Sequence, residues 1–133
     1  MHPEAKSPKY AKEDDAGMDL FALEEVAVLP GQIARVRSGM ALEIPKGFVG
    51  LCWDKSGLSM NHGIKVLAGV IDSSFRGELV MAVINLGKEP YIFEKGHKVM
   101  QILIQKVESC EVIESSELTS SGRGEKGFGS TGK

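Results

Sequence analysis

Apolar residues in this chain occur in short runs, and a glycine, proline or serine interrupts them about every 8–12 residues. An amphipathic helix would instead repeat apolar residues at every third or fourth position over a longer stretch, and almost no such period is present. The pattern therefore predicts an all-β sandwich or barrel. A length of 133 residues is enough for one such domain.

The apolar runs also place the expected strands. One short helical turn is expected after Ser56, through Leu58 and Met60, and no internal repeat is visible. The expected strands cover residues 18–22, 25–29, 33–37, 40–44, 48–53, 64–68, 79–86, 98–107 and 111–113.

The last stretch of the chain differs in composition. Between residues 115 and 133 only Leu118 and Phe128 are large and apolar, and glycine is frequent. Such a segment buries too little surface to offset the entropy of ordering it. We therefore predict a β-barrel domain over residues 1–114 and a mobile, glycine-rich C-terminal tail over residues 115–133.

Charge and cysteine content exclude several classes of protein. A formal net charge of −2 and a pI near 5.9 argue against a nucleic-acid partner, which a basic face would bind. Any phosphate ligand is then expected to be held by a few local donors. Cys52 and Cys110 lie far apart, without the spacing of metal ligands, and are expected to be reduced thiols.

Nothing in the sequence predicts a membrane partner. No apolar run reaches the roughly 18 residues that a membrane span needs. The first ten residues contain no hydrophobic segment of the kind found in signal peptides. These features favour an intracellular, cytoplasmic location.

Three local patterns suggest chemistry, and each also has a purely structural interpretation. Lys55, Ser56 and Gly57 combine a cation, a hydroxyl and a glycine where a strand ends, which suits an anion or merely a capped turn. Asp72 follows two β-branched residues, which favours a carboxylate against an apolar wall, but aspartate is also common in turns. Gln101 interrupts an apolar strand, so its amide either faces inward with a partner or faces solvent.

The tail contains a decoy. Residues 127–133, GFGSTGK, have the glycine and lysine spacing of a phosphate-binding P-loop, but no strand precedes them and no helix follows. The P-loop interpretation fails for that reason. Glycine amides together with Arg123 and Ser130 remain suited to a polyphosphate, and Phe128 is suited to stacking on a base.

Taken in order, these segments resemble the five motifs of the trimeric dUTPase family. The resemblance extends over residues 16–132, nearly the whole chain. The matching segments are residues 16–20 (AGMDL), 55–59 (KSGLS), 68–72 with 75–78 (AGVID, FRGE), 96–102 (GHKVMQI), and 123–124 with 127–132 (RG, GFGSTG).

This resemblance implies a jelly-roll-like β-barrel that assembles as a homotrimer. Each active site would draw on all three chains: motifs one, two and four from one subunit, motif three from a second, and the tail from a third. The implied activity is that of a dUTP diphosphatase, in which water attacks the α-phosphorus of dUTP and releases dUMP and pyrophosphate.

The resemblance also implies roles for individual residues. Asp72 would be the general base. Mg²⁺ would accompany the triphosphate, held mainly by phosphate oxygens and waters, with Asp19 contacting it through water. The residues implied in substrate binding are Lys55, Ser56, Gly57, Gly69, Val70, Ile71, Phe75, Val80, Gln101, Arg123, Phe128, Gly129 and Ser130.

Three positions depart from the family pattern: Lys55 replaces the usual Arg, Phe75 the usual Tyr, and His97 a common Asp. Residues 69–78, a turn rich in small and polar residues between two apolar runs, are expected to form a hairpin. A phenylalanine in that hairpin also occurs in the related dCTP deaminases, which need a glutamate near the base, and Glu78 is the nearest candidate. A dCTP deaminase, a bifunctional enzyme and a non-catalytic binding module therefore remain as alternatives.

Overall fold

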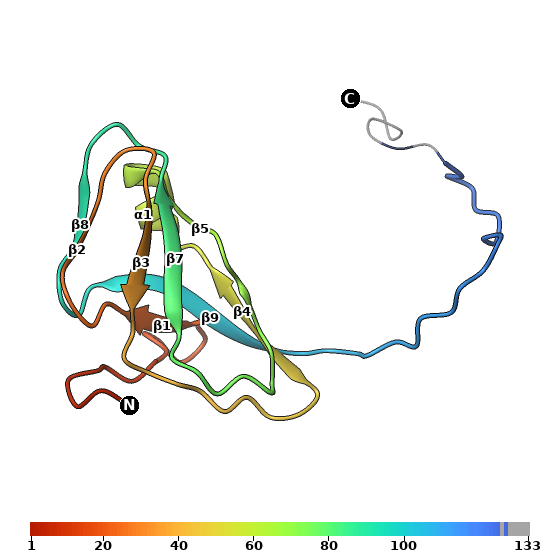
Figure 1. The fold of residues 1–133 in the computed structure, drawn as a ribbon, viewed down its shortest axis with the longest axis horizontal. Coiled ribbons are helices and arrows are strands. Elements are labelled where there is room, and N and C mark those ends of the chain that lie inside the picture. The colour runs from red at the N-terminus through yellow and green to blue at the C-terminus, as the bar shows by residue number, and fades with distance from the viewer. Residues whose placement is uncertain (126, 128–133) are drawn as a thin grey trace.

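The computed structural model describes residues 1–125 and residue 127, and it consists mainly of short strands (Figure 1). The only helix within the described residues is α1, of seven residues. In chain order the elements are β1 (Met18–Phe21), β2 (Val26–Val28), β3 (Ile33–Arg37), β4 (Phe48–Trp53), α1 (Ser56–His62), β5 (Ile64–Val66), β6 (Val70–Ile71), β7 (Val80–Asn85), β8 (Tyr91–Phe93) and β9 (Lys98–Lys106).

The strands form three antiparallel sheets. One has the order β1-β9-β4-β6, a second pairs β2 with β8, and a third has the order β3-β7-β5. Most neighbours in a sheet lie far apart in the sequence, and β1 and β9 are the most distant pair. The sheet β1-β9-β4-β6 matters most for function because it contains or adjoins the first four motifs.

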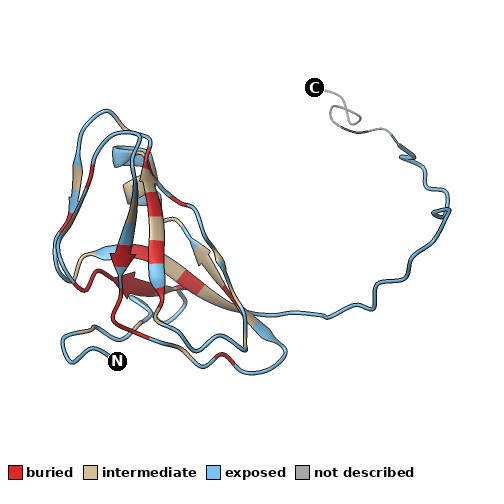
Figure 2. Ribbon diagram, in the orientation of Figure 1, coloured by how far each residue is buried: buried red, intermediate tan, exposed pale blue. Residues whose placement is uncertain are grey.

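The core lies between these sheets, and Figure 2 shows buried positions on β1, β3, β7 and β9. Along β7 the buried and less buried residues alternate, so that Met81, Val83 and Asn85 face inward. Asn85 is a buried polar residue, and its amide donates hydrogen bonds to the carbonyls of Val28 and Glu89. The inward amide is therefore satisfied, as a buried polar group must be.

Most expected elements are confirmed, including the all-β class and the short helix after Ser56. The strand expected at residues 40–44 is wrong: the amide and carbonyl of Met40 bond locally to Ser38, and one further bond joins Met40 to Leu79. The strand expected at residues 111–113 is also wrong, because Val112 and Ile113 are exposed and have no partner strand. The short strands β6 and β8 were not expected.

After β9 the chain leaves the barrel, and residues 107–125 form neither helix nor strand (Figure 1). Within the described part of the chain, no helix has the length and apolar character that crossing a bilayer demands. The intracellular location stays a prediction. Cys52 and Cys110 are both free cysteines, and burial raises the pKa of Cys52 to about 11.

Candidate active site

A buried carboxylate on β1 holds two lysine side chains. Asp19 has a side chain that is only 3% exposed. The ammonium group of Lys55, just before α1, donates a short hydrogen bond to Oδ1. The ammonium group of Lys98, at the start of β9, lies 2.7 Å from Oδ2 in an ion pair that is poorly aligned for a hydrogen bond. Residues from motifs one, two and four are thus in direct contact.

The charge state of Asp19 follows from these contacts. Burial by itself would raise the pKa of Asp19, because removal from water penalises the charged form. The short hydrogen bond from Lys55 and the nearby positive charges of Lys55 and Lys98 outweigh burial, so the pKa lies below its ordinary value of 3.8. Asp19 is therefore ionised at neutral pH.

Gln101 lies beside this cluster and connects two motifs. It stands opposite Asp19 on β1 and opposite Trp53 on β4. Its Nε2 donates a 2.9 Å hydrogen bond to the main-chain carbonyl of Asp54, the residue before Lys55. A Cβ atom added to Gly17 would lie only 2.9 Å from Oε1 of Gln101. The amide therefore has a structural partner, and it fixes where the Lys55 segment begins.

Asp54 extends these contacts toward β5. Its Oδ1 accepts a 2.7 Å hydrogen bond from the amide of Val66, and its Oδ2 accepts a 2.6 Å bond from Lys65 Nζ. Asp54 thus ties the start of the Lys55 segment to the strand that leads into the motif-three hairpin. No role was expected for Asp54 from the sequence.

The first residues of α1 are open to solvent. Lys55 occupies the N-cap position in an extended conformation, and no side chain caps the helix. The first amides of a helix lack carbonyl partners within it, so those of Ser56 and Gly57 suit an anionic ligand. A Cβ atom added to Gly57 would meet no atom within 4 Å. Packing within the chain therefore does not require glycine at this position.

The motif-three hairpin spans residues 67–79 between β5 and β7, which pair with each other, but its strand β6 pairs with the other edge of β4 and not with β7. Ile71 stands opposite Gly50, Val70 opposite Leu51, and the amide of Cys52 donates to the carbonyl of Gly69. Val70 is 68% exposed, so its side chain is not part of the core. The hairpin backbone around Gly69 is thus held firmly to β4.

Asp72 lies in a turn that directly follows β6. Its carbonyl accepts a hydrogen bond from the amide of Phe75, and its side chain is exposed. The expected apolar wall around Asp72 is therefore not formed by the residues that the structure describes. Phe75 and Val80 are both about two-fifths exposed, at 42% and 45%, and the Phe75 ring lies over Gly77.

Asp72 and Lys55 lie at opposite ends of β4. The pairing of Ile71 with Gly50 puts Asp72 level with residue 49, whereas Lys55 follows the other end of the strand. At about 3.3 Å per residue, the separation from position 49 to position 55 is roughly 20 Å. In Figure 1, α1 and the connection into β7 likewise lie at opposite ends of the barrel. One chain by itself does not bring Asp72 to the Lys55 segment.

Comparison with known proteins identifies the family. The dUTPase family model matches residues 3–132. A protein of Clostridium kluyveri named deoxyuridine 5'-triphosphate nucleotidohydrolase is 41% identical, over 99% of this chain and 94% of that protein. A protein of the same name from Mycobacterium leprae is 39% identical, over 99% and 91%. The chain belongs to the dUTPase family.

Solved dUTPase structures share the fold as well. The dUTPase of Staphylococcus bacteriophage 80alpha, solved with dUPNHPP, superposes with a TM-score of 0.92 at 29% identity, over 98% of this chain and 94% of that one. The expected jelly-roll-like β-barrel is therefore confirmed.

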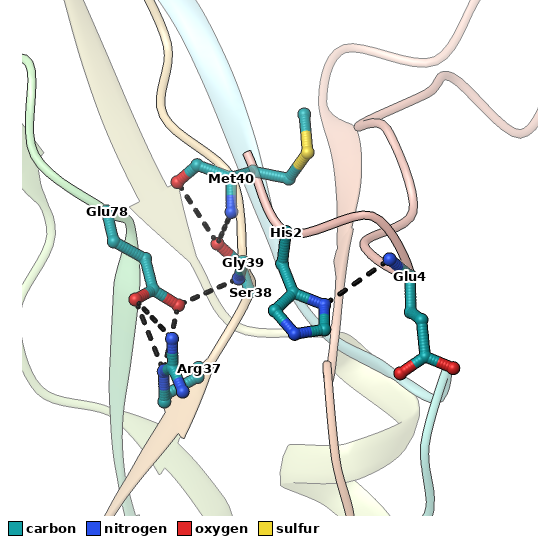
Figure 3. A network of polar contacts seen from close by, with 7 residues as sticks. All are labelled: His2, Glu4, Arg37, Ser38, Gly39, Met40 and Glu78. Carbon is teal, nitrogen blue, oxygen red and sulfur yellow. Dashed lines mark hydrogen bonds and ion pairs between the residues drawn. The ribbon is translucent and has the colours of Figure 1, made fainter.

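Membership of the dUTPase family does not favour a dCTP deaminase or a bifunctional enzyme. The contacts of Glu78 supply a structural reason (Figure 3). Nε and Nη2 of Arg37 donate hydrogen bonds to the Glu78 carboxylate, and the amide of Gly39 donates a third contact at 2.8 Å. These bonds lower the pKa of Glu78, and its carboxylate is committed to joining β3 to the segment before β7. A deaminase would need a glutamate that is available to activate water, and Glu78, the nearest candidate, is engaged in these bonds.

Metal ligands are sparse in this dUTPase. No group of three or more His, Cys, Asp or Glu side chains suited to a metal ion is found within the described residues. Asp19 fits as a contact for metal-bound water only after Lys55 or Lys98 moves, because both of its oxygens are covered.

The described part of the tail, up to residue 125, lies away from the cluster (Figure 1). Nη2 of Arg123 donates a 3.0 Å hydrogen bond to the carbonyl of Gly127, within the segment that has left the barrel. Phe128, Gly129 and Ser130 lie outside the described residues. His97 bonds within its own turn, where its Nδ1 accepts from the amide of Glu94.

Two residues of the site were missed as participants. Lys98 lies within motif four but had no assigned role, and Asp54 lies just outside motif two. For Lys98 the available signal was a cation in a strand whose partner strand contains Asp19. Recognising it requires knowing how β1 and β9 pair, and the local sequence pattern does not predict that pairing.

Proposed function

We propose that this chain hydrolyses dUTP to dUMP and pyrophosphate in active sites shared between the subunits of a homotrimer. The activity follows from membership of the dUTPase family across residues 3–132. The shared site rests on one observation above all. The Asp19–Lys55–Gln101 cluster and Asp72 lie at opposite ends of β4, roughly 20 Å apart along the strand.

In this scheme the Lys55 segment of one subunit binds the triphosphate. Lys55 and the amides of Ser56 and Gly57 supply positive charge and hydrogen-bond donors to phosphate oxygens. Gln101 supports that segment through its bond to Asp54. Arg123 of a third subunit would contact the distal phosphates, which requires its segment to move onto a neighbouring barrel.

The motif-three hairpin of the second subunit would bind the deoxyuridine. Its main chain is anchored to β4 at Gly69, which leaves the backbone of Val70 and Ile71 in a defined position. The exposed Phe75 ring would pack on the deoxyribose and exclude a 2′-hydroxyl. Val80, also exposed, would close the pocket, and Phe128 of the tail would cover the base.

Asp72 is the proposed general base. It would accept a proton from water as the water oxygen bonds to the α-phosphorus. The bond between that phosphorus and the oxygen bridging to the β-phosphorus breaks, and pyrophosphate leaves. An exposed carboxylate on a single chain suits this role, because a neighbouring subunit's phosphates would complete its surroundings.

The family generally uses Mg²⁺, and we propose the same ion here. When bound to the triphosphate, it would neutralise phosphate charge and so make the leaving pyrophosphate more stable. Asp19 is the residue of this chain proposed to accept hydrogen bonds from its waters, which requires one lysine ammonium group to leave the Asp19 carboxylate for the phosphates as the triphosphate binds.

The decisive experiment incubates the purified protein with dUTP, dCTP or UTP and Mg²⁺, and measures pyrophosphate and ammonia. Pyrophosphate from dUTP alone is the expected result. Ammonia from dCTP would indicate a deaminase, and the absence of both products would indicate a binding module.

A further inference from the structure

The Asp19 cluster carries a surplus positive charge. Among the ion pairs within the described residues, Asp19 is the one carboxylate with two cationic partners. Elsewhere pairing is one to one, as between Lys65 and Asp54 or Arg37 and Glu78. Two ammonium groups on one carboxylate leave a net charge of about +1 at this place, although the whole chain has a formal charge of −2.

The exposure of the three side chains is graded. The Asp19 side chain is 3% exposed, that of Lys55 28%, and that of Lys98 45%. The carboxylate thus lies beneath the surface, and both lysines extend from it toward solvent. The surplus charge is consequently accessible to a ligand.

Neutralising Asp19 requires only one of the two lysines. The short hydrogen bond from Lys55 already provides a cation for the buried carboxylate. The second ammonium group lies close to the first, and like charges at such separations repel. An anion bound on the solvent side would relieve that repulsion. Because the site is partly shielded from water, the attraction between the anion and the two ammonium groups is stronger than it would be in bulk solvent.

We propose that Lys98 is a second triphosphate-binding lysine, which Asp19 holds beside Lys55 as a two-ammonium clamp. The proposal rests on the proposed function, since it assigns the surplus charge to the triphosphate of the same site. Each ammonium group is a point donor, so the two contact different phosphate oxygens. Asp19 is then a positioning residue that holds both lysines in place before the triphosphate binds.

Inorganic tripolyphosphate tests this directly, because it has the phosphates of the substrate and no base. Its affinity is measured by calorimetry at low salt, where screening is weak, for the full-length protein and for Lys98→Met. The matched control is Lys106→Met on the same strand, where a 76% exposed lysine lies 3.9 Å from Glu108. Deoxyuridine, which has no phosphate, is titrated in parallel.

We expect Lys98→Met to weaken tripolyphosphate binding roughly tenfold and to leave deoxyuridine binding unchanged. Lys98→Arg should retain most of the affinity, and Lys106→Met should match the original protein. If thermal unfolding shows that the methionine variant is not folded, Lys98→Gln takes its place. For dUTP, the KM should rise while kcat changes little.

Two results would overturn the proposal. One is unchanged tripolyphosphate affinity in Lys98→Met. The other is an equal loss of deoxyuridine affinity together with a lower melting temperature, which would make Lys98 a purely structural residue. The proposed function fails separately: it is wrong if the unaltered protein binds tripolyphosphate but releases no pyrophosphate from dUTP.

Discussion

Gln101 donates a 2.9 Å hydrogen bond from Nε2 to the main-chain carbonyl of Asp54, and so fixes the point at which the Lys55 segment leaves β4. Replacing Gln101 with leucine removes this donor and leaves the carbonyl unpaired. We expect a loss of roughly 1–3 kcal/mol in unfolding free energy and a several-fold rise in the KM for dUTP. Urea unfolding and steady-state kinetics measure the two effects. Gln105→Leu, at an exposed position of the same strand, is the control and should change neither.

Asp72→Asn tests the proposed general base. The amide has nearly the same shape but cannot take a proton from water, so kcat should fall by roughly 100-fold or more while nucleotide binding persists. Turnover from dUTP and binding of a non-hydrolysable analogue provide the two measurements. Near-normal turnover would remove Asp72 from the mechanism. Asp14→Asn, an exposed carboxylate in the N-terminal segment, should remain fully active.

Removal of residues 122–133 separates folding from catalysis. The buried hydrophobic residues of the described chain lie between Leu20 and Ile102, so the shortened protein should fold with an almost unchanged melting temperature. Hydrolysis should nevertheless fall severely, because Arg123 and Phe128 are lost.

Mixing the shortened protein with Asp72→Asn tests the shared site. The shortened protein lacks the tail, whereas Asp72→Asn lacks the proposed general base. If the tail and the base of one site come from different chains, mixed trimers would contain some complete sites. We expect partial recovery of dUTP hydrolysis after the subunits are exchanged. No recovery, despite demonstrated mixed trimers, would contradict the shared site.

The lowered pKa of Asp19 predicts a specific pH dependence of stability. A carboxyl whose pKa is lower in the folded than in the unfolded state stabilises the fold above its unfolded value, here 3.8. That contribution disappears as the pH falls through the still lower folded pKa. The difference in unfolding free energy between the original protein and Asp19→Asn should therefore shrink below about pH 4. A difference that stays constant on acidification would show that Asp19 is not ionised in the fold.

Gly57→Ala distinguishes a requirement of the ligand from a requirement of the fold. Since an added Cβ atom meets no neighbour and alanine favours helix, stability should be unchanged or rise by up to ~1 kcal/mol. Activity should fall, because a methyl group would hinder the approach of phosphate to the first helical turn. Met60→Ala, an 85% exposed position on the same helix, should leave activity intact. Full activity in Gly57→Ala would argue against phosphate at that turn.

The sequence by itself predicted the fold class, because alternation and strand breakers are local properties. Residues 33–37 and 48–53 were expected as strands and match β3 and β4. The failures at residues 40–44 and 111–113 have a common cause: an apolar run becomes a strand only when another strand pairs with it. The motifs, likewise read from local sequence, were sufficient to indicate the dUTPase family.

The tertiary structure decided which side chains meet. Asp19 and Lys98 are far apart in the sequence and come together because β1 pairs with β9 in one register. A shift of that register by one residue would turn the Asp19 side chain toward the opposite face of the sheet. The same kind of pairing, between β4 and β6, carries Asp72 away from Lys55. Local sequence determines whether a strand can form, but long-range hydrogen bonding determines what its side chains contact.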